Sequence, residues 1–159
     1  MKRATITLIS LDTSTTDTGY AIFKNSKLKK YGDFDHKKDQ DRIDLMCHDI
    51  YKLIIKEKPD IIVAEDLNVM KSVKTAKMLS EVIGAVRMCQ FITDKDTFFY
   101  KMPPKHWRSL VGSNVPRKRT ECKVWDIMKL KEIYSIETTN DNIADAVLIG
   151  LAYITEFSC

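Results

Sequence analysis

Cysteines are few and widely spaced in this chain of 159 residues. Cys47, Cys89, Cys122 and Cys159 lie more than thirty residues apart, and no two of them form a C-x-x-C pair. This spacing excludes both a cysteine-based zinc site and a disulfide framework. We therefore expect reduced thiols, as in a cytoplasmic protein.

Long hydrophobic runs are absent as well. No segment approaches the roughly 20 apolar residues of a membrane helix. Asp12 interrupts the first apolar stretch too early for a secretory signal. The chain also lacks internal repeats, low-complexity stretches and linkers. With 44% hydrophobic and 30% charged residues, we predict a single globular domain over residues 1–159 without a membrane segment.

Neither sign of charge is in large excess, since the formal net charge is only +4. The distribution is uneven, however. Between Lys101 and Lys131 there are nine basic residues and two acidic ones, and the densest cluster is Arg117–Arg119. Basic side chains that gather in one region neutralise phosphates and release counterions, which favours a polyanionic substrate. A solvated surface face is the alternative.

Strand and helix patterns alternate along the chain. A β-meander followed by alternating helices and strands predicts an α/β fold, in which a mixed five-stranded sheet has helices on both faces. The patterns predict strands at 5–12, 19–23, 28–34, 61–64 and 97–102, a further short strand at 134–136, and helices at 43–54, 69–91, 121–130 and 143–157.

Carboxylates stand at the ends of apolar segments that are far apart in the sequence. Asp12 ends the first strand, Glu65 follows the strand at 61–64, and Asp141 and Asp145 open the last helix. Parallel strands present their carboxyl ends at one edge of a sheet, and residues four apart share a helix face. We therefore expect these acids to converge. Carboxylate oxygens suit Mg²⁺, so the pattern predicts a metal-dependent enzyme that acts on a phosphodiester.

Each acid also has a structural alternative. Asp12 can cap the polar turn that follows it, because short polar side chains bond their own backbone. Glu65 can be a surface acid at a strand end. Asp141 can be the N-cap of the last helix, so that a cap and a ligand are both open for this residue.

Three motifs resemble those of the RuvC-type Holliday junction resolvases. The segment Asp12–Tyr20 is similar to the first motif, in which an Asp is followed seven residues later by Gly-Tyr. Ala64–Glu65 is similar to the second. Asn142–Ala146 resembles the third, in which an acid lies three residues before an Asp-Ala pair. Order and rough spacing agree over nearly the whole chain, and its small, lysine-rich form resembles phage-encoded members.

The resemblance implies an RNase H-like fold, a homodimer that cuts branched DNA, and two divalent ions in each active site, Mg²⁺ with Mn²⁺ as an alternative. Two such ions about 3.5–4 Å apart can clamp a phosphodiester. Asp12 is expected to bridge the ions, with Glu65 on one and Asp145 on the other. The products would carry 5′-phosphate and 3′-hydroxyl ends. The family pattern places its fourth acid at Asn142, so that either Asp141 or Asn142 fills this position.

Substrate contacts follow from the resemblance and the charge pattern together. The family has a base-stacking aromatic where this chain has Asn68. Since stacking contributes about 1–3 kcal/mol per base, we predict an enzyme that also cuts forks. Tyr100, His106 and Trp107 are candidates for stacking or for positioning phosphate, with a core position as the alternative for Trp107. The predicted DNA-binding residues are Lys71, Lys74, Lys105, Arg108, Arg117, Lys118 and Arg119.

The helix predicted at 69–91 carries two apolar stripes. One is expected to pack on the sheet and the other on a second copy of the chain, which would suit the near two-fold symmetry of a four-way junction. A helix buried within one chain is the alternative. The stripes consist of Val69, Val73, Ala76, Leu79, Ile83 and Val86, and of Met78, Val82, Ala85 and Cys89.

Two other functions share part of this pattern. The segment Leu11–Thr16 also resembles the phosphate loop of the actin-like and sugar-kinase ATPases. The chain has only five glycines, however, and no glycine-rich adenosine segment. A degraded nuclease site would leave a protein that binds branched DNA without cutting it. The presence of Asp12, Glu65 and Asp145 favours an active endonuclease.

Overall fold

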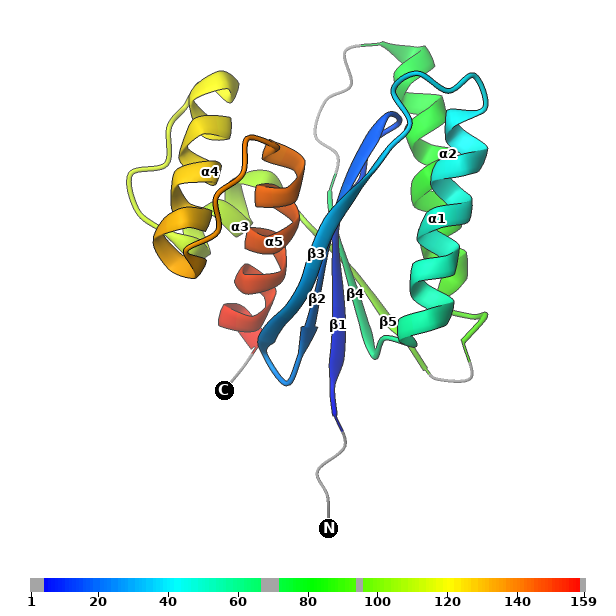
Figure 1. Cartoon of the computed structure of the whole chain (residues 1–159), viewed down its shortest axis with the longest axis horizontal. Helices are drawn as coiled ribbons and strands as arrows, with labels where there is room; N and C mark the ends of the chain where they lie inside the picture. Colours follow the sequence, from blue (N-terminus) through cyan, green and yellow to red (C-terminus); the bar gives the residue numbers. More distant parts are fainter. Residues whose placement is uncertain (1–4, 67–71, 94–95, 158–159) are drawn as a thin grey trace.

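The fold is a mixed five-stranded sheet between two helical layers (Figure 1), as the sequence predicted. The computed structural model describes residues 5–66, 72–93 and 96–157. The strand order is β3-β2-β1-β4-β5, in which β1, β4 and β5 pair in parallel and β2 is antiparallel to both of its neighbours, β1 and β3. The elements are β1 Thr7–Asp12, β2 Asp17–Lys24, β3 Lys27–Asp35, α1 Arg42–Glu57, β4 Ile61–Glu65, α2 Val73–Cys89, β5 Phe98–Met102, α3 Pro104–Val111, α4 Arg119–Tyr134 and α5 Asp141–Phe157.

Successive residues of β1 face opposite helical layers, because side chains alternate along a strand. Ile9 and Leu11 pack in the core formed with α1 and α2. Leu8 packs in the second core, with residues of α3, α4 and α5. Ser10 and Asp12 share the face of Leu8 and therefore point toward the layer that contains α5. The central strand is buried on both faces, and its terminal carboxylate lies under α5.

Close packing of α5 on the sheet depends on two glycines. A Cβ atom at Gly19 of β2 would lie 1.9 Å from the carbonyl oxygen of Asn142, in the first turn of α5. A Cβ atom at Gly150 would lie 2.3 Å from the Phe23 ring and 2.6 Å from Ser10 Oγ. The Ser10 hydroxyl in turn donates a hydrogen bond of 2.6 Å to the carbonyl of Ala146. These contacts fix the start of α5 beside the end of β1.

Two sequence-based expectations differ from the structure around α3 and α4. The helix α3 was not predicted; it begins at Pro104, directly after β5, where proline fits the first turn of a helix. The strand expected at 134–136 is wrong. Tyr134 is the last residue of α4, and Ser135 ends the helix in the left-handed conformation, donating its N–H to the carbonyl of Lys131.

The helix α2 buries parts of both predicted apolar stripes within this chain. Leu79 and Val86 of the first stripe and Val82 and Cys89 of the second are all buried, and the helix packs against α1. Val69 lies outside the described residues. The large apolar side chains that this segment leaves exposed are Val73, Met88, Phe91 and Ile92.

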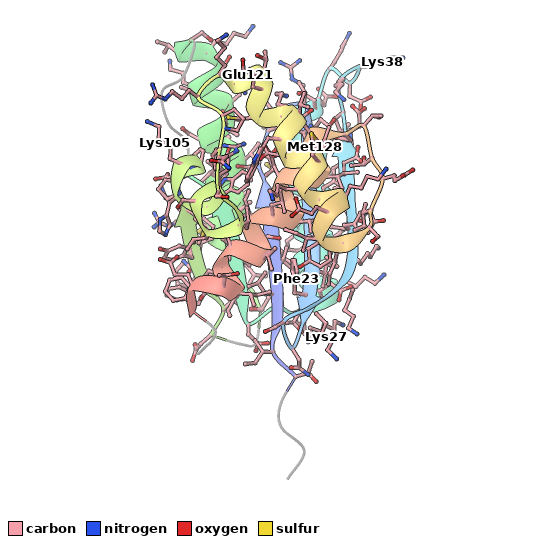
Figure 2. The ribbon with its side chains drawn as sticks, turned by 90° about the vertical axis from the view of Figure 1, so that its left-hand side faces the viewer. Phe23, Lys27, Lys38, Lys105, Glu121 and Met128 are labelled. Carbon is pink, nitrogen blue, oxygen red and sulfur yellow. The ribbon has the colours of Figure 1, made fainter. Side chains whose placement is uncertain are left out.

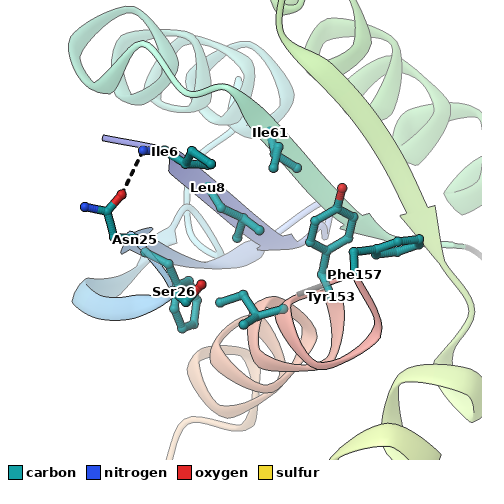
Figure 3. Close-up of a pocket in the computed structure, with 9 residues that line it drawn as sticks. Ile6, Leu8, Asn25, Ser26, Ile61, Tyr153 and Phe157 are labelled. Atoms are coloured by element: carbon teal, nitrogen blue, oxygen red, sulfur yellow. Dashed lines mark hydrogen bonds between the residues drawn. The ribbon is translucent and has the colours of Figure 1, made fainter. Parts of the chain in front are cut away.

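An apolar pocket lies at the end of the sheet where β1 begins, away from Asp12, and Figure 3 shows residues that line it. Its volume is about 210 Å³, and its walls include Leu8 and Ile61 of the sheet and Tyr153 and Phe157 of α5. The strand β1 runs from this pocket to Asp12, so the two sites are separated by its length. Over the described ranges, no helix combines the length and the apolar character needed to cross a bilayer.

Candidate metal centre

Three carboxylates from distant parts of the chain meet at one end of the sheet. Asp12 ends β1, Glu65 ends the adjacent parallel strand β4, and Asp145 lies in the second turn of α5. Each contributes an oxygen to a group in which all ligand atoms lie within 4.8 Å of one another. Asp12 and Asp145 are only 9% and 8% exposed. The structure thus brings together three of the four acids predicted from the sequence.

The fourth predicted acid, Asp141, is not the N-cap of α5. Asn140, which precedes the helix, accepts the backbone N–H of Asn142 on its side-chain oxygen at 2.9 Å. Asp141 is the first helical residue and forms an ion pair with Lys123 of α4. It lies outside the group of three acids, although its charge acts on Asp12. Asn142 meets Gly19 through its backbone carbonyl.

The polar turn after β1 is closed by Ser14 and Thr18. The backbone N–H of Ser14 donates to Thr18 Oγ1 at 3.0 Å, and the Thr18 hydroxyl donates to the carbonyl of Ser14 at 3.2 Å. The turn therefore has its own side-chain hydrogen bonds. Because the turn does not need the Asp12 carboxylate as a cap, the turn-cap alternative is not supported, and this carboxylate is available to the group with Glu65 and Asp145.

Burial and mutual repulsion raise the pKa values of these carboxyl groups. Burial raises the pKa of Asp12 well above its usual value, Glu65 and Asp141 raise it further, and Lys123 and Arg108 oppose this effect. Burial likewise raises the pKa of Asp145, with Asp12 as the next cause. For Glu65, burial raises the pKa and the hydrogen bond from Trp107 opposes it.

These residues fit a divalent cation. An ion would offset the repulsion between the buried carboxylates, because a bound cation is the largest local charge in such a site. Asp145 Oδ1 is buried and has no hydrogen-bond partner. A buried oxygen of this kind is costly unless it gains a partner, and a metal ion supplies one. The donor set consists of carboxylate oxygens, which suits Mg²⁺ or Mn²⁺.

Two residues of α3 hold two of these carboxylates. The indole N–H of Trp107 donates to Glu65 Oε1 at 3.0 Å, and Trp107 is fully buried. The Arg108 guanidinium lies 4.1 Å from the centroid of the Trp107 ring, binds Asp126 of α4, and reaches Asp145 Oδ2 at 3.5 Å. Trp107 is therefore a core residue, as the alternative interpretation held, and its ring is not accessible for stacking on DNA bases. Sequence analysis missed this role of Trp107, as well as Asp126 and Lys123.

Most predicted DNA-binding side chains are exposed around the carboxylate end of the fold. Lys74 lies at the start of α2, Lys105 on α3, and Arg117–Arg119 at the start of α4; these helix starts flank the end of β1 (Figures 1 and 2). Lys118 forms an ion pair of 3.4 Å with Glu121. Lys71 and Asn68 lie outside the described residues.

Arg108, Tyr100 and His106 are placed differently from what the sequence suggested. The Arg108 side chain is only 12% exposed and is engaged by carboxylates, which does not support direct phosphate binding in this conformation. The Tyr100 ring packs against Tyr153 and Phe157, toward the far end of α5. His106 Nε2 contacts Glu156 at 2.9 Å. Neither the Tyr100 ring nor the His106 imidazole contacts the group of Asp12, Glu65 and Asp145 in the contacts described.

A second acidic group contains its own counterion. Asp17, Asp33 and Asp35 lie on β2 and β3, with ligand atoms within 4.8 Å of one another. The Lys37 ammonium contacts Asp17 at 2.6 Å and Asp35 at 3.2 Å. Because a lysine already neutralises part of this charge, the group has a structural explanation.

We expect the Asp12→Asn variant to be more stable than the native protein at neutral pH without metal. Burial raises the pKa of Asp12, so the folded state keeps a proton that the unfolded state releases near pH 3.9. The Asp12 contribution to the unfolding free energy is therefore present below that pH and is lost as pH rises through the folded pKa. The amide of the Asp12→Asn variant is uncharged throughout this pH range, so the variant does not lose this stability as the pH rises.

Thermal unfolding in EDTA from pH 4 to pH 8 measures this effect. The melting temperature of the variant should exceed that of the native protein by an amount that grows with pH. Saturating Mg²⁺ should stabilise the native protein more than the variant. A difference that stays constant with pH would contradict the assigned cause.

Comparisons with known proteins place this geometry in context. No family model matches the chain. A curated relative, crossover junction endodeoxyribonuclease RuvC of Carboxydothermus hydrogenoformans, is 26% identical over 113 residues, which cover 70% of this chain and 68% of that protein. Among solved structures, Thermus thermophilus RuvC in complex with Holliday junction substrate matches with a TM-score of 0.75 and 13% identity, over 94% of this chain and 93% of that one.

A viral protein has the same fold. Fowlpox virus resolvase in complex with its substrate Holliday junction DNA matches with a TM-score of 0.66 and 17% identity, over 97% of this chain and 100% of that one. These structural likenesses confirm the expected RNase H-like fold. Together with the curated relative, they confirm the resemblance to RuvC-type proteins that was based on three short motifs.

Proposed function

We propose that this chain, which has the motifs and the fold of the RuvC-type resolvases, is an endodeoxyribonuclease that resolves Holliday junctions. The observation that carries the proposal is the convergence of Asp12, Glu65 and Asp145 within 4.8 Å, in a fold shared with junction-bound relatives. The reaction is hydrolysis of a phosphodiester, with 5′-phosphate and 3′-hydroxyl products.

The proposed cofactor is a pair of Mg²⁺ ions, for which Mn²⁺ can substitute. Asp12, which ends β1 beside Glu65 on the neighbouring strand and Asp145 on α5, would contribute ligand oxygens to both ions, with Glu65 and Asp145 holding one each. Ions held there would supply an activated water and positive charge at the leaving 3′ oxygen. Trp107 orients Glu65 through its indole N–H. Asp141, held by Lys123, is the further acid at the rim of the site.

Exposed basic side chains would hold the DNA arms on either side of the carboxylates. Lys74 lies on one side, and Lys105 with Arg117–Arg119 on the other. Such contacts neutralise backbone phosphates and carry no base specificity, so binding should weaken steeply with added salt. This placement supports branched DNA as the substrate, because it lets separate arms pass both flanks of one site.

The proposed assembly is a homodimer, since paired nicks on opposite strands require two active sites. The proposed contact surface consists of the exposed apolar side chains Val73 and Met88, near the two ends of α2, and Phe91, just beyond it. A partner that covers them would remove apolar surface from water. Val82 and Cys89 of the second stripe are buried within this chain and are not available for this contact.

We expect Met88→Glu to weaken dimerisation at least about tenfold, because a buried unpaired carboxylate costs more than the roughly 1.4 kcal/mol that this factor represents. Sedimentation of the variant over a concentration series measures the change. Met128→Glu on α4 is a matched control, because Met128 is 65% exposed against 58% for Met88 (Figure 2). Dissociation by Met128→Glu alone would place the interface on α4 instead.

Cleavage of a labelled, immobile four-way junction tests the function. With Mg²⁺ or Mn²⁺ we expect paired nicks at symmetric positions in opposing strands, and none in EDTA. A Y-fork should be cut at a rate within about tenfold of the junction rate, because stacking on one base is worth about 1–3 kcal/mol and the predicted aromatic is missing. Binding without cutting would identify a protein that binds junctions but does not cleave them. The absence of junction binding would favour the alternative of an actin-like or sugar-kinase-like nucleotide-binding protein.

A further inference from the structure

A fully buried acid lies beside the candidate metal centre without belonging to it. Asp126 of α4 has no exposed surface. Its carboxylate accepts hydrogen bonds from Arg108 Nε at 3.0 and 3.2 Å and from Arg108 Nη2 at 2.7 Å. Burying such an ion pair costs desolvation free energy. Apolar residues of similar volume in the same place often give equal or greater stability. The pair therefore needs an explanation beyond stability.

Arg108 connects Asp126 to the metal carboxylates. The Nη2 atom that lies 2.7 Å from Asp126 lies 3.5 Å from Asp145 Oδ2. The guanidinium also stacks on Trp107, whose indole holds Glu65. Its charge acts on the carboxyl groups of Asp12, Glu65 and Asp145 alike. A fixed cation is thus placed within reach of the same oxygens that a metal ion would use.

A guanidinium so close to a metal site is a potential competitor. It forms strong bidentate bonds with carboxylates, and without a better partner it would bind the metal-ligating oxygens themselves. Asp126 supplies that better partner: it binds two nitrogens of Arg108 in a bidentate arrangement, so that Arg108 makes only the long contact with Asp145. The Asp126 carboxylate also acts on Asp145 directly and raises its pKa. Asp145 Oδ1 remains unpaired.

We propose that Asp126 is a positioning residue that retains the Arg108 guanidinium at the edge of the carboxylate group and thereby keeps the space between Asp12, Glu65 and Asp145 open for metal ions. The inference rests on the proposed function, because it requires that these acids bind metal. Arg108 then balances part of the negative charge without occupying the site. Removing the Asp126 charge releases Arg108 onto Asp145.

Mn²⁺ binding to the purified chain without DNA tests this proposal, with free Mn²⁺ followed by electron paramagnetic resonance. We expect Asp126→Asn to weaken Mn²⁺ binding at least about tenfold, the usual effect of changing a residue that orients metal ligands. The double variant Asp126→Asn with Arg108→Gln should recover affinity to within about threefold of the native chain, because the competing cation is gone. A merely structural defect would not be rescued in this way.

Two further variants complete the design. Asp126→Glu keeps the carboxylate and should bind Mn²⁺ with native affinity, which provides a test that does not depend on the folding of the amide variant. Glu132→Gln removes an exposed acid of the same helix that pairs with Lys129, and should change nothing.

The outcomes separate this inference from the proposed function. Native Mn²⁺ affinity in Asp126→Asn, a tenfold loss in Asp126→Glu, or a double variant as weak as the single one would overturn the positioning role alone. Failure of the native chain to bind Mn²⁺ would overturn the metal site itself, and this inference with it.

Discussion

Substitution of Asp12 by Asn is expected to abolish junction cleavage and to leave junction binding intact. Asp12 ends the central strand and shares its surroundings with Glu65 and Asp145. The amide has the same shape but no charge, so it weakens the site for cations. Removing one electrostatic stabiliser in other enzymes costs about 10²–10³-fold in rate. We expect at least that loss in single-turnover cleavage at saturating Mg²⁺.

The fold should survive this change for a specific reason. The turn after Asp12 is closed by Ser14 and Thr18, so the carboxylate is not needed to form it. The variant should also be the more stable protein without metal, which separates lost activity from unfolding. Asp44→Asn, at an exposed acid in the first turn of α1, is the matched control. Cleavage by the Asp12 variant within tenfold of native would exclude this carboxylate group as the catalytic centre.

Substitution of Gly19 by Ala is expected to disturb the structure more than alanine at any other glycine of this chain. The added Cβ would lie 1.9 Å from the carbonyl oxygen of Asn142 and 2.4 Å from its carbon. Both atoms are backbone, so no side chain can rotate away, and the start of α5 must move. Overpacking in well-packed cores costs about 1–3 kcal/mol, and we expect about 3 kcal/mol or more here.

Activity should fall together with stability, because α5 carries Asp145. Gly19 is the residue paired with Asp12 across β1 and β2, so displacement of α5 acts directly on the carboxylate group. Urea unfolding and single-turnover cleavage measure the two effects. Gly84→Ala is the control: its Cβ meets nothing within 4 Å in the exposed middle of α2, and alanine should stabilise the chain by about 0.5–1 kcal/mol. Equal stability of the Gly19 and Gly84 variants would contradict the packing described here.

The sequence was most informative where a local signal marked a position in the sheet. Acids that follow apolar strands had to lie at the carboxyl edge, and a helix pattern placed Asp145 one turn beyond Asp141. The Gly-Tyr pair of the first motif could be recognised but not explained. Its reason is a contact between Gly19 and Asn142, and such contacts depend on how α5 lies on the sheet.

The sequence-based predictions were wrong where contacts between distant parts of the chain determine what a residue does. Arg108 was assigned to DNA because it lies in a basic segment, but Asp126 of the next helix captures it. No local pattern in the sequence links these two residues, because they lie 18 positions apart on two helices that both pack against α5. The start of α3 did carry a usable signal, since Pro104 suits a first helical turn. For 134–136, the β-prone residues Tyr134 and Ile136 suggested a strand, but α4 continues through Tyr134 and ends at Ser135.

The hydrogen bond from Ser10 to Ala146 joins residues 136 positions apart, and the carboxylate group spans almost the same stretch of chain. During synthesis, Asp12 and Glu65 leave the ribosome long before Asp145, and α5 can dock only on a sheet that already exists. Non-local contacts of this kind form late in folding. For the proposed nuclease this implies a built-in delay: an incomplete or misfolded chain would hold too few metal ligands to cut DNA, and activity would arise only in a finished fold.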